Sequence, residues 1–165
     1  PMGKELDSLA DVVSFGMAPG AIVFSFLAGL DIAWWLPFAG FLIPVFSGLR
    51  LAKFNIDTRQ AESFIGLPVP ANAIFWGSLI TSFPLFFTNN PWILFILVGL
   101  FCFLLVSEIP MFSLKFKNLG WKQNKLQYFF LLVNVALLAV FQLNAFAPII
   151  AWYILLSVTV AVLKK

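Results

Sequence analysis

The chain has 165 residues, of which 62% are hydrophobic and only 10% are charged. A soluble domain carries about 25% charged residues, so this composition excludes an ordinary water-soluble fold and indicates an integral membrane protein. The formal net charge of +3 requires no nucleic-acid partner, because basic residues next to a membrane face anionic lipid headgroups. The sequence has no histidine and one cysteine, Cys102, which excludes histidine catalysis, histidine metal sites and a disulfide framework.

Six apolar segments, separated by Gly, Pro, Asn or charged residues, approach the length of about 20 residues that a helix needs to cross a bilayer. They cover residues 7–30, 32–54, 70–87, 92–114, 126–143 and 149–163. No internal repeat separates them into groups. The sequence therefore predicts an all-α, polytopic membrane helix bundle that forms a single domain, residues 1–165, with about six transmembrane helices.

The basic residues predict how this bundle is oriented, because Lys and Arg stay on the cytoplasmic side of a membrane. With six spans, all ten Lys and Arg residues fall on the side of the two termini, whereas the opposite loops carry only Asp31 as a charged residue. We therefore expect a multi-pass protein of the cell (inner) membrane whose two termini face the cytoplasm. Glu108, at the cytoplasmic end of the fourth segment, is expected to pair with Lys115 or another basic residue.

Two carboxylates, Asp7 and Asp11, lie one helical turn apart on a stripe that also holds Gly3 and Ser14. Neighbouring ionised carboxylates repel each other and are costly near lipid unless a cation lies beside them. Without His or Cys ligands, the pattern favours a hard divalent ion, Mg or Mn. Gly3 would let a ligand or a helix approach closely. The alternative is that "DSLAD" caps an interfacial helix, whose N-terminus favours acidic side chains.

The same stretch carries a resemblance to a known family. "GKELDSLAD" resembles the second half of the signature of the CDP-alcohol phosphatidyltransferases, D-x-x-D-G-x-x-A-R followed by G-x-x-x-D-x-x-x-D, with Gly3, Asp7 and Asp11 at the last three fixed positions. "SFGMAP", "RLAKFN" and "FIGLPVPA" resemble the phosphatidylserine synthase branch. The first half of the signature has no counterpart here, so we expect a domain that lacks the N-terminal helices of the family.

This resemblance implies transfer of a phosphatidyl group from CDP-diacylglycerol to L-serine, with release of CMP. By position in the signature, Asp7 would bind the divalent metal, and Asp11 would contact the metal and deprotonate the serine hydroxyl. With half of the acidic ligands absent, the 165 residues alone are expected to insert in a membrane but to be inactive. Five residues are predicted to bind substrate: Gly3, Ser14, Arg50, Lys53 and Asn55.

Several alternatives stay open. Arg50 and Lys53 could be basic anchors whose stems snorkel to the cytoplasmic surface, and Asn55 could cap the end of a helix. Another acceptor alcohol, glycerol phosphate or inositol phosphate, would keep the family but should require a further basic cluster. A small membrane transporter or scaffold is the alternative from another class. The expected partners are CDP-diacylglycerol, L-serine and the bilayer, and a homodimer is also left open.

Overall fold

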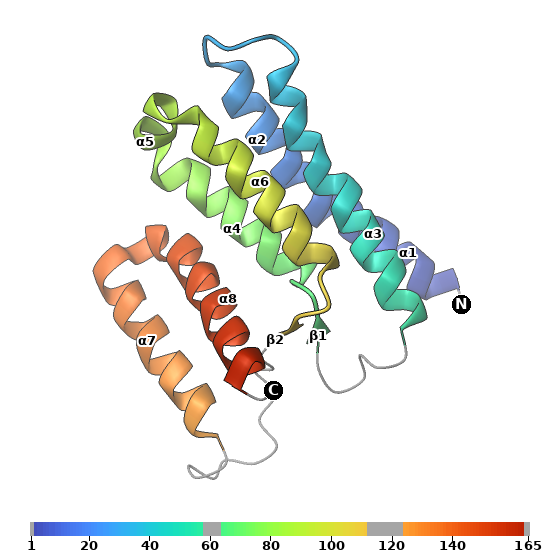
Figure 1. Ribbon diagram of the computed structural model, residues 1–165, viewed down its shortest axis with the longest axis vertical. Helices are drawn as coiled ribbons and strands as arrows, with labels where there is room; N and C mark the ends of the chain where they lie inside the picture. The colour runs from blue at the N-terminus through green and yellow to red at the C-terminus, as the bar shows by residue number, and fades with distance from the viewer. Residues whose placement is uncertain (1, 58–63, 112–123, 164–165) are drawn as a thin grey trace.

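The computed structural model describes residues 2–57, 64–111 and 124–163, and these residues are almost entirely helical (Figure 1). In chain order the elements are α1 (Met2–Asp11), the π-helix η1 (Val12–Met17), α2 (Ala18–Ala28), the 3-10 helix η2 (Leu36–Phe41), α3 (Leu42–Ile56), β1 (Phe64–Ile65), α4 (Val69–Ser82), α5 (Pro84–Asn89), α6 (Pro91–Val106), β2 (Pro110–Met111), α7 (Lys125–Phe141), the 3-10 turn η4 (Gln142–Ala145) and α8 (Phe146–Leu163).

The predicted all-α membrane bundle is confirmed. Three helical stretches among the described residues are long and apolar enough to cross a membrane: Glu5–Ala28, Leu36–Ile56 and Lys125–Leu163. The last of these folds back on itself at η4, where Gln142 has a φ of 52°, so α7 and α8 form a hairpin (Figure 1). Helices also lie at the positions of the other predicted segments. The number of spans and the side of each terminus stay predictions.

The fourth predicted segment ends earlier than expected. The sequence predicted apolar helix to residue 114, but α6 ends at Val106 and Ser107 has extended backbone, with ψ at 156°. Pro110 disfavours helical backbone in the residue before it, and β2 instead pairs antiparallel with β1. Gly66 fits closely beside this junction: its φ is +75°, and a Cβ there would lie 2.7 Å from the carbonyl oxygen of Leu105.

Small residues let the first helical stretch pack closely against α3 and η2. A Cβ added to Gly20 would lie 2.7 Å from Cδ of Pro44, and one added to Gly40 would lie 2.8 Å from the carbonyl oxygen of Gly20. A Cβ on Gly16 would lie 3.1 Å from Cβ of Ser47. In membrane bundles such residues allow backbones to approach each other. These contacts determine how close η1 lies to α3, and therefore the geometry of the site described below.

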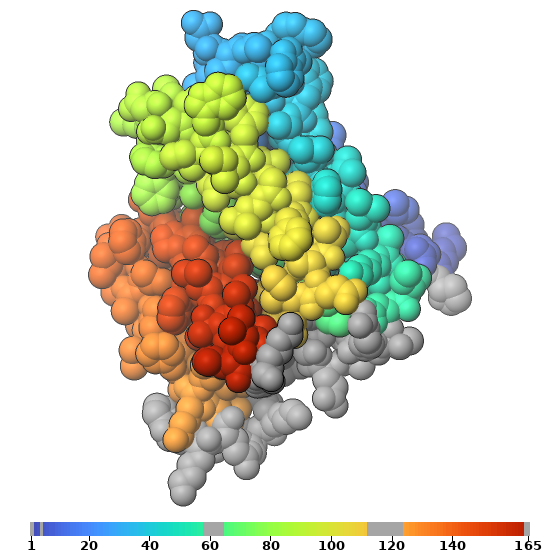
Figure 2. All heavy atoms as spheres, viewed as in Figure 1, coloured from blue at the N-terminus to red at the C-terminus, as the bar shows by residue number. Residues whose placement is uncertain are grey.

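The remaining helices complete the bundle. α6 contacts α3, while α4 contacts α2 and η1 and also contacts α8, so α4 joins the hairpin to the rest (Figure 1). The ring of Phe75 stacks on that of Phe101 at 4.0 Å, beside the fully buried Trp76. The space-filling view shows the hairpin closely packed along the bundle (Figure 2). One end of the bundle therefore carries α1, the last turns of α3 and α6, and the first turn of α4.

The close approach at Gly40 gives a test of the packing. Gly40→Ala should lower the free energy of unfolding in detergent by about 1–3 kcal/mol, because the added methyl group overlaps the backbone of Gly20 and Phe24. Gly77→Ala is the matched control, since a Cβ there meets nothing within 4 Å, and alanine should leave stability unchanged or raise it by up to about 1 kcal/mol. Equal effects of the two substitutions would contradict this packing.

Candidate functional site

The two carboxylates of the predicted site lie on α1, one turn apart. Asp7 is exposed and Asp11 is half-buried where α1 passes into η1. The cap interpretation is wrong, because the residues before Asp7 are already helical from Met2 onward. Both side chains therefore belong to the body of α1, a helix that contacts α3.

Arg50 is a buried cation on α3, the helix that contacts α1. Its side chain is only 5% exposed, and its guanidinium Cζ lies 4.9 Å from the ring centroid of Phe54. The electrostatic surroundings of the guanidinium include Tyr153 of α8 and, to a smaller extent, Asp11. A snorkelling anchor keeps its head group in water, whereas that of Arg50 is buried. Anchoring alone therefore does not explain Arg50, and the structure brings it together with Asp11.

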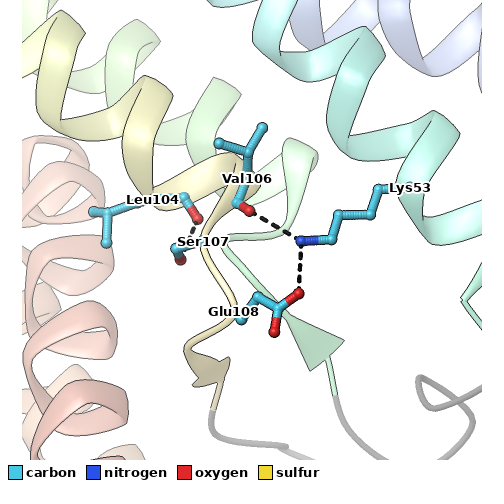
Figure 3. A network of polar contacts seen from close by, with 5 residues as sticks. All are labelled: Lys53, Leu104, Val106, Ser107 and Glu108. Atoms are coloured by element: carbon cyan, nitrogen blue, oxygen red, sulfur yellow. Dashed lines mark hydrogen bonds and ion pairs between the residues drawn. The ribbon is translucent and has the colours of Figure 1, made fainter.

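Lys53 points to a different neighbour. Its Nζ donates to Oε1 of Glu108 at 3.2 Å and to the carbonyl oxygen of Val106 at 3.2 Å (Figure 3). The hydroxyl of Ser107 donates to the carbonyl oxygen of Leu104 at 2.9 Å. Glu108 was expected to pair with a basic residue, and Lys53 is that residue; Lys115 lies outside the described residues. Lys53 thus connects the end of α3 to the end of α6, and binding of substrate by it stays a prediction.

Asn55 links α3 to α1 directly. Its Nδ2 donates to Oγ of Ser8 at 2.9 Å, next to Asp7 in the sequence. The helix-cap alternative for Asn55 is wrong, because α3 continues to Ile56 and its C-cap residue is Asp57. No motif pointed to Ser8. The hydrogen bond holds the last turn of α3 against the helix that carries the two carboxylates.

Gly3 and Ser14 are both exposed. A Cβ on Gly3 would meet nothing within 4 Å, so none of the described helices uses the space beside it. Ser14 lies in η1, where hydrogen bonds run from residue i+5 to residue i, as from the N–H of Ala18 to the carbonyl oxygen of Val13. The 3.6-residue spacing that placed Ser14 on the stripe of Asp11 does not hold there. Ligand binding by either residue stays a prediction.

Two buried polar residues were missed by sequence reasoning. Ser47 of α3 and Asn72 of α4 are 0% exposed. Each belongs to an element that contacts η1. Neither lies in a pattern of charged or metal-binding residues, and a single Ser or Asn in an apolar segment gives no signal of its own. Their position beside η1 is a property of the folded bundle.

The donor set on α1 fits a hard divalent cation. The described residues contain no group of three His, Cys, Asp or Glu side chains arranged around one point, so the protein ligands offered here are the oxygens of Asp7 and Asp11. Magnesium commonly keeps several waters and is held by one or two carboxylates together with substrate phosphates. Carboxylates alone, with no sulfur or imidazole, favour Mg or Mn over softer metals.

The chain is similar to a family model and to several named proteins. Residues 1–112 match the family model described as CDP-alcohol phosphatidyltransferase. The chain is 39% identical over 112 residues to the CDP-diacylglycerol–serine O-phosphatidyltransferase of Bacillus subtilis, covering 66% of this chain and 57% of that protein. It is 33% identical over 170 residues to the protein of the same name from Mycobacterium bovis, covering 96% of this chain and 55% of that protein.

A third relative carries a different name. The archaetidylserine synthase of Methanothermobacter thermautotrophicus is 42% identical over 72 residues, which cover 44% of this chain and 30% of that protein. The chain spans about half the length of the two more fully covered relatives. No solved structure matches the chain.

The contact between α3 and α6 can be tested by exchanging charges. Lys53→Glu should lower the free energy of unfolding by about 1 kcal/mol, because it puts an acidic group beside Glu108 and beside the carbonyl end of α6. Adding Glu108→Lys should restore part of that loss. Thermal or denaturant unfolding of the two single variants and the double variant measures the coupling, and strictly additive effects would show that the two side chains do not interact.

Proposed function

Because the chain belongs to the CDP-alcohol phosphatidyltransferase family, we propose that the full-length protein transfers a phosphatidyl group from CDP-diacylglycerol to L-serine, giving phosphatidylserine and CMP. The observation that carries this proposal is the alignment of nearly the whole chain, 96% of it, with a relative named for that reaction. The acidic face of α1 beside the buried Arg50 supports it. The reaction is a step of phospholipid biosynthesis.

Asp7 and Asp11 are the residues proposed to hold the divalent cation, Mg or Mn. When bound, such a cation would neutralise negative charge on the diphosphate and polarise its oxygens. The two carboxylates lie on one helix face, so in the full-length protein the remaining oxygen ligands would come from the upstream acidic residues of the family signature, the substrate diphosphate and water. The exposure of Asp7 and the partial burial of Asp11 suit an ion at the surface of the bundle, where a charged headgroup can approach.

Asp11 is further proposed to act as the base. The hydroxyl proton of serine would pass to the carboxylate of Asp11 while the serine oxygen attacks the phosphorus that carries the diacylglycerol. The bond from that phosphorus to the oxygen of CMP then breaks, and CMP leaves. A carboxylate is a weak base for an alcohol, so close orientation toward the nucleophile must contribute much of the effect. The link between Asn55 and Ser8 supports that orientation by holding α1 against α3.

Arg50 is proposed to bind an anionic group of a substrate while facing Asp11. A guanidinium matches a phosphate or a carboxylate with two parallel hydrogen bonds, and burial strengthens its electrostatic interactions. Acceptors that carry a phosphate should require a further basic cluster. Of the two cations on the last turns of α3, Lys53 is engaged by Glu108, which favours serine over glycerol phosphate or inositol phosphate.

The carboxylates provide the test of this mechanism. In the full-length protein, Asp7→Asn and Asp11→Asn should each lower phosphatidylserine formation by about 10²- to 10⁴-fold, because they remove a charge while keeping the size of the side chain. Membrane insertion should be unchanged. Asp31→Asn, in the exposed turn after α2, is the control and should keep full activity. Wild-type rates in both the Asp7 and the Asp11 variants would rule out the carboxylate mechanism.

The proposed site faces the cytoplasm of a multi-pass inner-membrane protein, and labelling can test this orientation. In a Cys102→Ser background, cysteines at Asn89 and Asn144 should react with an impermeant reagent added to intact cells. Cysteines at Gln60 and Asn118, which lie outside the described residues, should be protected. The physical basis is the gathering of Lys and Arg on one side. Labelling of Asn118→Cys from outside would contradict the six-span topology.

A further inference from the structure

Tyr153 lies in the middle of α8, in a part of the chain that the family model does not cover. The match to that model ends at residue 112, whereas the hairpin of α7 and α8 spans Lys125–Leu163. Tyr153 is nevertheless only 7% exposed. Its ring packs against that of the buried Phe130 of α7, with 6.1 Å between the ring centroids. The side chain therefore lies in the interior of the protein and not against lipid.

The hydroxyl of Tyr153 has a partner on its own helix, as a buried phenol usually does. The side chain of Ser157, one turn further along α8, is hydrogen-bonded to that of Tyr153. The hydroxyl of Ser157 donates to the backbone carbonyl oxygen of Tyr153 at 2.8 Å, so its oxygen is the atom that accepts from the phenol. The phenol proton is thereby directed to Ser157, and the phenol oxygen, the negative end of the dipole, faces its other neighbours.

Arg50 is one of these neighbours. Tyr153 is the first of the groups that interact electrostatically with the guanidinium, ahead of Asp11. The two helices that carry Arg50 and Tyr153 lie on opposite sides of α4 and α6 (Figure 1): α3 packs on η1 and α6, and α8 packs on α4 and β2. Because both residues are buried, their side chains reach toward each other through the interior of the bundle.

A chain of contacts fixes how far apart α3 and α8 lie at this end of the bundle. Lys53, one turn after Arg50, donates to the carbonyl oxygen of Val106 and to Glu108 at the end of α6. β2 begins two residues after Glu108 and contacts α8. The backbone therefore holds the base of Tyr153 at a set position relative to that of Arg50, and the orientation of the guanidinium is left to the side chains around it.

We propose that Tyr153 is a positioning residue for Arg50, so that the hairpin of α7 and α8 completes the proposed site. This inference rests on the proposed function, in which Arg50 binds an anionic group of a substrate. An arginine side chain loses much rotamer freedom when it is fixed in one orientation. A phenol is neutral at physiological pH, so it attracts the guanidinium without cancelling its charge. The charge of Arg50 then remains for the substrate.

The test is Tyr153→Phe in the full-length protein, which removes the phenol oxygen and keeps the ring that packs on Phe130. The kcat/KM for phosphatidylserine formation should fall about 3- to 30-fold, as expected for loss of one polar contact with a charged group. In an Arg50→Gln background the same substitution should have no further effect, because the group that it positions is gone. Tyr128→Phe, which changes the other tyrosine of the chain, is the control and should keep the wild-type kcat/KM.

Thermal unfolding of the wild type, the two single variants and the double variant gives a second measurement, which needs no substrate. Tyr153→Phe should lower the thermal midpoint, and should lower it less in the Arg50→Gln background. This comparison decides the matter if Arg50→Gln is too inactive for kinetics.

Three results would overturn the positioning role: a wild-type kcat/KM in Tyr153→Phe, a fall by the same factor in both backgrounds, or equal shifts of the thermal midpoint in both backgrounds. Failure of the wild-type protein to form any product from serine would instead contradict the proposed function, and the thermal comparison would still show whether Tyr153 and Arg50 interact.

Discussion

The buried charge of Arg50 is the constraint on which the arrangement of this end of the bundle depends. Arg50 is 5% exposed as a whole residue, and a buried guanidinium is costly unless opposite charge and polarisable groups lie around it. Asp11 supplies the opposite charge, and the ring of Phe54 lies 4.9 Å from Cζ. For Asp11 to lie near this guanidinium, α1 and η1 must lie very close to α3. Gly16, packed against Ser47, allows that approach.

Two polar links hold the same end of the bundle in place. Asn55 connects α3 to Ser8 of α1, and Lys53 connects α3 to the end of α6 through Glu108 and Val106. Each link is modest alone, since partly exposed ion pairs and neutral hydrogen bonds contribute about 1 kcal/mol or less. Together they restrict the last turn of α3, and so the position of Arg50 relative to the acidic face.

The positions of the helices were predictable because apolar length and punctuation by Gly and Pro are local signals. The helical spacing of Asp7 and Asp11, and the family resemblance of the stretch that holds them, also identified the acidic face. The early end of α6 at Val106 was not predicted: Pro110 is a local signal against helix, but the extended segment also depends on pairing between β1 and β2, which are distant in sequence. The π-helix was missed for a related reason: hydropathy does not distinguish it from an α-helix. Lys53 pairs with Glu108 across two segments distant in sequence, and Ser47 is buried against η1. Such contacts between segments are not encoded in any local pattern.

We propose that the acidic face of α1 and the adjacent Arg50 serve transfer of a phosphatidyl group to serine. The most direct measurement is release of CMP by the purified full-length protein supplied with CDP-diacylglycerol, with and without L-serine and a divalent cation. The account predicts that CMP appears only when serine and the cation are both present, in equal amount to phosphatidylserine. Release of CMP that is independent of serine, or release at the same rate after chelation of the cation, would contradict it.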